Sequence, residues 1–190
     1  MLKKRNELPN FKKLDWEVDV DLLLSCFQNW NHEQDTISEV CGSPYLNELY
    51  KQTPVTVSNE KIILKNGKED ERTYGEILPQ YKGTYVEEVL NNFKSPFTRA
   101  RLVVKEPGAI ILPHIDYDTT YSVRYYIPLK TNVWCHTAVK GKNDIEPEIR
   151  HLPADGSVWF VNPGSSHSAW NFGKTNDIRL IVACNGQEDL

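Results

Sequence analysis

The chain has 190 residues, of which 39% are hydrophobic and 25% are charged, as is usual for a globular protein with one domain. Its 22 basic and 26 acidic residues give a formal net charge of −4, whereas a protein that binds nucleic acid is expected to carry a basic face. The longest apolar run, Leu180 to Cys184, is too short to span a bilayer, and the basic start of the chain lacks the apolar region of a secretory signal. We therefore expect a cytoplasmic protein that binds neither nucleic acid nor membrane.

The four cysteines are Cys26, Cys41, Cys135 and Cys184. No two of them form a C-x-x-C pair, and the chain is neither short nor rich in cysteine. A disulfide scaffold or a structural zinc site is therefore not expected. We predict reduced and mostly buried thiols.

The N-terminal part, residues 1–97, is predicted to be a mixed, partly helical extension that packs on a catalytic core. Apolar spacing favours a helix in 17–30, and the Asn66-Gly67 dipeptide favours a hairpin over 55–67. A short helix is expected in 84–93, with Thr84 as its N-cap and Glu87 completing a capping box.

From Thr98 onward the pattern is β. Short runs rich in Val, Ile, Tyr, Trp and Phe alternate with turns such as Pro107-Gly108 and Asn162-Pro163-Gly164. The expected strands are 101–105, 122–129, 133–139, 148–152, 157–161, 166–172 and 178–184. Many short strands at this spacing are typical of a sandwich, a barrel or a jelly roll, and we place this mainly β core at residues 98–190.

The motif His114-Ile115-Asp116 stands in this region, with His167 51 residues after Asp116 and Arg179 12 residues after His167. Two imidazoles and one carboxylate are the ligands of a non-haem Fe(II) site with open positions. Residues i and i+2 of a strand point to one face, so His114 and Asp116 could share a metal. A lone histidine is more often a surface or core residue, so the prediction depends on all three residues and on the turn that precedes His167.

Four stretches resemble the Fe(II)/2-oxoglutarate-dependent oxygenases, within them the aspartyl/asparaginyl β-hydroxylase and proline hydroxylase-like group. They are RARLVVKEPGAIILPHIDYD, SVRYYIPLKTN, DGSVWFVNPGSSHSAWNFG and DIRLIVAC, and they lie within the span from Arg99 to Asn185, which is a little under half of the chain. The resemblance implies a double-stranded β-helix, a fold of the jelly-roll type, which agrees with the strand pattern. It also implies Fe(II) as cofactor and 2-oxoglutarate as co-substrate.

By the same resemblance, the metal ligands and catalytic residues fall on His114, Asp116 and His167. The aspartyl/asparaginyl β-hydroxylases lack the carboxylate ligand, so Asp116 is more similar to the proline hydroxylase branch. The family's co-substrate arginine falls on Arg179 and a second arginine on Arg124. Some relatives have a histidine where this chain has Tyr126, which we include among the predicted co-substrate contacts.

Physical chemistry supports an arginine for this role, because a buried carboxylate needs a charged partner and guanidinium pairs well with it. Arg179 stands in an otherwise apolar run, where an unpaired charge would be costly; the alternative is an edge strand on which it points to water. Ser122, Arg124 and Tyr126 share one strand face, which we interpret as the pocket. The alternative is that this face is exposed and that the opposite one, with Val123, Tyr125 and Ile127, is the core.

Three further residues are predicted substrate contacts: Arg101, Asn171 and Trp134. A turn-capping role before Gly173 is the alternative for Asn171. Specificity is expected to reside in the N-terminal part and in the loops 118–121 and 140–148.

The activity implied by the resemblance is hydroxylation of an unactivated C–H bond with release of succinate and CO₂. The substrate would be a small molecule such as a free amino acid, or an amino-acid side chain, with O₂ as the other reactant. Two alternatives remain: a cupin-type metal protein or isomerase, and a non-enzymatic jelly-roll binding module. A cupin would have no need of Arg179.

Overall fold

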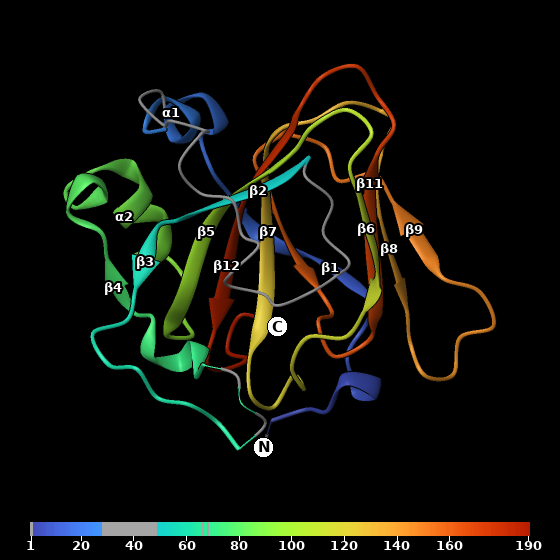
Figure 1. The fold of residues 1–190 in the computed structure, drawn as a ribbon, viewed down its shortest axis with the longest axis horizontal. Helices are drawn as coiled ribbons and strands as arrows, with labels where there is room; N and C mark the ends of the chain where they lie inside the picture. The colour runs from blue at the N-terminus through green and yellow to red at the C-terminus, as the bar shows by residue number, and fades with distance from the viewer. Residues whose placement is uncertain (1, 28–48, 66, 68) are drawn as a thin grey trace.

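The structure is a computed structural model that describes residues 2–27, 49–65, 67 and 69–190. Two antiparallel sheets pack face to face (Figure 1). The six-stranded major sheet has the order β1-β10-β7-β12-β5-β2, and the four-stranded minor sheet has the order β6-β11-β8-β9. The major-sheet strands are β1 (Phe11–Glu17), β2 (Tyr50–Pro54), β5 (Phe97–Lys105), β7 (Val123–Lys130), β10 (Ser157–Val161) and β12 (Asp177–Cys184). The minor-sheet strands are β6 (Ile110–His114), β8 (Cys135–Lys140), β9 (Glu148–Arg150) and β11 (Ser166–Asn171).

From β5 to β12 the chain passes back and forth between the two sheets, and only β8 and β9 follow each other in the same sheet. This alternation is the topology of a jelly roll, so the predicted mainly β fold is confirmed. A short pair, β3 (Thr56–Val57) with β4 (Glu76–Ile77), stands apart from the two sheets. The helices are α1 (Val20–Ser25) and α2 (Tyr85–Asn91), with 3₁₀ turns η1 (Arg5–Glu7), η2 (Glu71–Thr73) and η3 (Pro79–Tyr81).

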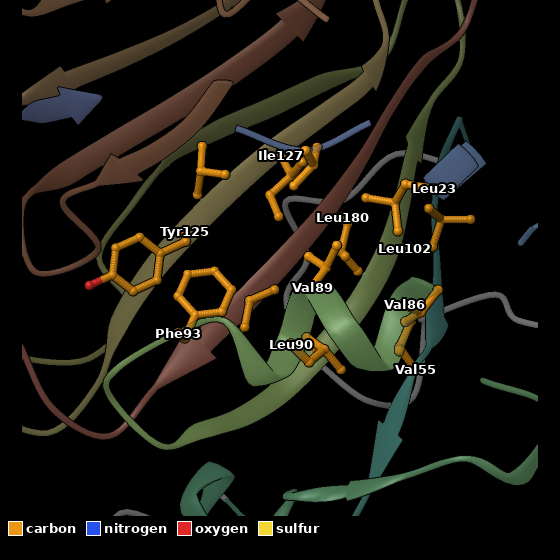
Figure 2. Packing of buried hydrophobic residues seen from close by; sticks show 14 of the residues in the cluster. Leu23, Val55, Val86, Val89, Leu90, Phe93, Leu102, Tyr125, Ile127 and Leu180 are labelled. Atoms are coloured by element: carbon orange, nitrogen blue, oxygen red, sulfur yellow. The ribbon is translucent and has the colours of Figure 1, made fainter. Parts of the chain in front are cut away.

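The largest apolar cluster lies between the helices and the outer face of the major sheet, not between the sheets (Figure 2). Val86 and Leu90 of α2 pack there with Tyr125 of β7 and Leu180 of β12. Strand side chains alternate between faces, so burying one face of β7 under the helices turns its other face toward the minor sheet. That inner face is where polar and charged side chains collect.

The predicted helix in 84–93 is confirmed by α2. The Thr84 hydroxyl accepts a hydrogen bond from the Val86 backbone N–H, while Glu87 accepts one from Gly83 rather than from Thr84. The helix predicted in 17–30 is α1, although Glu17 belongs to β1 and residues 28–30 lie outside the described part of the chain. Cys41 also lies outside it, and the other three cysteines are free thiols, as expected.

The hairpin predicted over 55–67 is wrong. β3 pairs with β4, which lies beyond the expected turn, and near Gly67 the chain closes a single bridge between Ile63 and Glu69. Ile62 and Ile63 are 43% and 52% exposed. These two side chains therefore contribute little to the core, and among the described residues the bridge is not extended into a longer ladder.

The N-terminal part also contributes two strands that were not predicted. β1 pairs with β10 at one edge of the major sheet and β2 pairs with β5 at the other. In β1 the register shifts between Lys13 and Glu17, which breaks the alternation by which a strand is recognised. Residues before 97 therefore complete the sheet itself as well as cover it. Among the described helices, none has the length and apolar character needed to cross a bilayer.

Candidate metal centre and its arginines

Three candidate ligands meet at one end of the minor sheet. His114 ends β6 and is paired in register with His167 of β11. Asp116 follows β6 instead of lying on it, and its backbone N–H donates to the Pro163 carbonyl at 3.0 Å. One potential ligand atom from each residue lies within 4.8 Å of the others. The structure thus brings the three predicted ligands together, with a loop rather than a strand placing Asp116.

Both imidazoles present Nε2 to the same point. Nδ1 of His114 donates to the Leu112 carbonyl at 2.8 Å, and Nδ1 of His167 donates to the Ser165 carbonyl at 3.0 Å. Nε2 then lies 3.6 Å from Asp116 Oδ1 for His114 and 3.9 Å from Asp116 Oδ2 for His167. A histidine ligand needs its other N–H held in this way, which fixes the tautomer and the ring orientation.

The protonation states also suit a metal. Burial lowers the pKa of His167, which favours the neutral imidazole. Burial raises the pKa of Asp116, but the surrounding cationic groups, of which Arg124 keeps its charge when His167 is neutral, hold this pKa well below its usual range. A neutral imidazole and an ionised carboxylate are the forms that bind divalent metals. Two nitrogens and one carboxylate fit Fe(II), with room in its coordination sphere for further ligands.

Arg124 of β7 lies beside the triad on the inner face of the major sheet. It is 3% exposed, so the alternative in which this face points to water is wrong, although Val123, Tyr125 and Ile127 do form core on the other side. The guanidinium Nε is 3.5 Å from Asp116 Oδ2, and Nη2 donates to Glu71 at 2.5 Å.

Arg179 of β12 is 1% exposed, so it does not point to water as the edge-strand alternative held. Its Nε donates to Asp177, and its Nη1 donates to the Thr137 hydroxyl of β8 at 3.0 Å. Asp177 also pairs with Lys105 of β5 at 2.6 Å. Nη2 of Arg179 is buried and has no hydrogen-bond partner among the described residues. A held guanidinium with a spare donor is suited to bind a carboxylate.

Two further predicted residues lie on the same inner face. Arg101 of β5 has two buried nitrogens, Nε and Nη1, that lack a partner in the described part of the chain. Burial lowers the pKa of Arg101, and the charges of Arg99 and Arg124 lower it further. Tyr126 of β7 packs in both small apolar clusters between the sheets, and burial raises the pKa of its phenol.

Asn171 and Trp134 are not brought to the triad. Asn171 ends β11 four residues after His167, which is about 13 Å along a strand. Its amide group bonds the Lys105 and Thr175 carbonyls and the Gly173 N–H, so the turn-capping alternative describes it. Trp134 precedes β8 and is 62% exposed. The geometry gives no support to either residue as a substrate contact.

Sequence reasoning missed Glu71, which reaches the centre from η2, and the partners of Arg179, which are Asp177, Lys105 and Thr137. Asp177 lies two residues before Arg179, and Lys105 lies four residues after Arg101, so each shares a strand face with a predicted arginine. This even spacing is a sequence signal for both residues. Nothing near Glu71 in the sequence signals its role, because its contacts depend on tertiary structure.

The chain belongs to the aspartyl/asparaginyl beta-hydroxylase family, whose model matches residues 28–186. An L-proline cis-4-hydroxylase of Rhizobium meliloti (strain 1021) is 34% identical over 85 residues, which are 43% of this chain and 28% of that protein. The match thus spans little more than a quarter of that relative.

A solved structure supports the fold. It is an oxidoreductase of the 2OG-Fe(II) oxygenase family from Burkholderia pseudomallei, with a TM-score of 0.58 and 12% identity over 93% of this chain and 85% of that one. At this identity the likeness concerns the fold alone. It agrees with the jelly roll that the strand order shows.

Proposed function

We propose that this protein is an Fe(II)- and 2-oxoglutarate-dependent dioxygenase that hydroxylates an unactivated C–H bond of a small substrate, such as a free amino acid or an amino-acid side chain. The observation that carries the proposal is the convergence of His114, Asp116 and His167 in a jelly roll whose inner face also buries Arg179 with a spare donor. Fe(II) with 2-oxoglutarate and O₂ would supply the oxidation of the C–H bond, and the co-substrate would leave as succinate and CO₂.

The roles of the chain's own residues follow from their surroundings. The triad holds the metal, and Arg179 receives the far carboxylate of 2-oxoglutarate through Nη2, with the Thr137 hydroxyl alongside. Asp177 and Lys105 hold Arg179 in place on its other side. Tyr126 and Arg124 remain proposed neighbours of the co-substrate on the inner face of β7.

Arg101 is the proposed substrate contact. Its two partnerless nitrogens are buried, and leaving donors unsatisfied in this way is costly. A substrate with an anionic group would satisfy them, and the carboxylate of an amino acid is such a group. The L-proline cis-4-hydroxylase among the relatives supports this class of substrate.

The proposal is tested by adding Fe(II) and 2-oxoglutarate to the purified protein without air. A chelate of both on the triad gives a weak visible charge-transfer band, and His167→Ala is expected to abolish it. His136→Ala, on the neighbouring strand, is the matched control and should keep the band. A band that survives in H167A would contradict the ligand assignment. Screening amino acids for substrate-stimulated succinate formation then identifies the substrate.

A further inference from the structure

Glu71 joins the N-terminal part of the chain to the candidate metal centre. It lies in η2, is 5% exposed, and its two carboxylate oxygens accept from different arginines. Oε1 accepts from Nη1 of Arg99 at 2.9 Å, and Oε2 accepts from Nη2 of Arg124 at 2.5 Å. A buried carboxylate shared by two guanidinium groups is held firmly and balances part of their charge.

The backbone around Glu71 is held as well. Its N–H donates to the Tyr121 hydroxyl at 3.1 Å, and that hydroxyl donates to Asp70 Oδ1 at 2.5 Å. Asp70 also accepts from Arg72 through two nitrogens. Tyr121 belongs to the loop that follows Asp116, so the segment that carries Glu71 and the segment that carries the metal ligand are tied together.

Arg124 connects Glu71 to the ligand carboxylate. Its Nη2 is bound to Glu71, its Nη1 donates to the Ser122 hydroxyl at 3.2 Å, and its Nε faces Asp116 Oδ2 at 3.5 Å. The other Asp116 oxygen, Oδ1, is the one near His114 Nε2. The guanidinium therefore lies at ion-pair distance from Oδ2, the oxygen that is also 3.9 Å from His167 Nε2, and leaves Oδ1 toward His114.

We propose that Glu71 is a positioning residue of the metal centre, which acts through Arg124 to orient Asp116 and to offset cationic charge near the metal. The inference rests on the proposed function, since it requires a metal on the triad. Without the Glu71 charge, Arg124 is drawn more strongly to Asp116 and competes with the metal for it. The added positive charge also repels a divalent cation, so both effects weaken metal binding.

The test is titration of Co(II) alone into the metal-free protein, followed by its visible d–d absorption. Glu71→Gln is expected to raise the Co(II) Kd severalfold, less than the roughly 10-fold or more that follows loss of a direct partner of a metal ligand, and to change the band shape. Glu76→Gln is the matched control, because Glu76 lies nearby in β4 and is only paired at the surface, with Lys82 at 3.6 Å. E76Q should bind Co(II) like the unaltered protein.

The outcomes separate the inference from the proposed function. If the unaltered protein binds Co(II) and a folded E71Q binds it with the same Kd and spectrum, the role of Glu71 is refuted and the metal site stands. If the unaltered protein binds no Co(II), both fall together. Should E71Q not fold, Glu71→Asp takes its place, because the shorter side chain cannot reach both arginines, so Arg124 loses its partner and Co(II) binding is expected to weaken. A folded E71D with unchanged Co(II) affinity and spectrum overturns the inference.

Discussion

At the scale of single residues, the charges beneath Arg179 have to balance. Asp177 is fully buried between Arg179 and Lys105, at 2.9 Å and 2.6 Å respectively. Burial raises the pKa of Asp177, but its two cationic neighbours outweigh burial and bring this pKa to about 2. Burial lowers the pKa of Lys105 to about 8, against the attraction of Asp177. The carboxylate is thus the group that permits two cations to share one buried place.

The pKa of Asp177 sets a pH dependence. Its folded-state pKa of about 2 lies below the ordinary value of 3.8, so its stabilisation is present above pH 3.8 and lost as the pH falls through about 2. At about 1.4 kcal/mol for each pKa unit, this is about 2–3 kcal/mol of unfolding free energy. Asp177→Asn lacks this dependence and should cost about 3–5 kcal/mol at pH 6, because it leaves two buried cations unpaired.

Urea unfolding at pH 6 and pH 3 measures both effects. The difference in unfolding free energy between the unaltered protein and D177N should shrink at the lower pH. Asp15→Asn changes an exposed aspartate of β1 and serves as the control, with little effect at either pH. Equal stability of D177N and the unaltered protein at pH 6 would show that Asp177 does not balance Arg179 and Lys105.

How far the site can be predicted from sequence differs from residue to residue. His114, Asp116, His167 and Arg179 are recognisable because their motif and spacing carry the chemistry. Glu71 is not recognisable in the sequence, because its proposed role depends on a contact with Arg124, which is 53 residues away. Trp134 shows the opposite failure. A large aromatic residue near a strand suggests a pocket wall, yet its place just before β8 leaves it in solvent.

At the scale of elements, a helix or strand can be predicted from sequence when the residues that stabilise it lie close together in the chain. α2 has a capping threonine before it and buries Val86, Val89 and Leu90 at helical spacing, so it can be read from the sequence. β1 and β2 are edge strands of the major sheet whose partners lie far along the chain. Their register is fixed by pairing with β10 and β5, so a short stretch of sequence around β1 or β2 does not contain the residues that make it a strand.

The cap of α2 gives a prediction at this scale. Thr84→Ala removes the hydroxyl that accepts from the Val86 N–H and should lower the unfolding free energy by about 1 kcal/mol. Because α2 packs on the outer face of the major sheet, the Co(II) affinity of the inner site should not change. Urea unfolding and Co(II) titration measure the two quantities, and Thr84→Ser should restore stability. A loss of stability in T84S equal to that in T84A would argue against the cap.

At the scale of the whole molecule, the two sheets have different roles in the candidate site. The helices bury the outer face of the major sheet in apolar contacts, which leaves the inner face free to carry arginines. Strands β6 and β11 of the minor sheet carry the two histidines of the triad, and the loop that follows β6 carries Asp116. The bond from Arg179 of β12 to Thr137 of β8 already joins the sheets. A co-substrate held by the metal at one end and by Arg179 at the other would join them a second time.

This arrangement predicts coupled stabilisation by metal and co-substrate. Mn(II) at 100 times its Kd should add about 2.7 kcal/mol, which for a chain of this size raises the melting temperature by about 5–11 °C. Since 2-oxoglutarate needs the metal for one of its two attachments, it should raise the melting temperature strongly only when Mn(II) is present. Thermal unfolding with each ligand alone and with both measures the coupling.

Arg179→Lys separates the two attachments. It keeps a positive charge next to Asp177 but loses the planar pair of donors that a carboxylate requires. The shift caused by Mn(II) should remain in R179K, whereas the increment from 2-oxoglutarate should largely disappear. Thermal shifts from 2-oxoglutarate that are the same with and without Mn(II) would mean that the acid binds away from the triad. Since the triad would then still hold its metal, such a result would relocate the co-substrate without removing the metal centre.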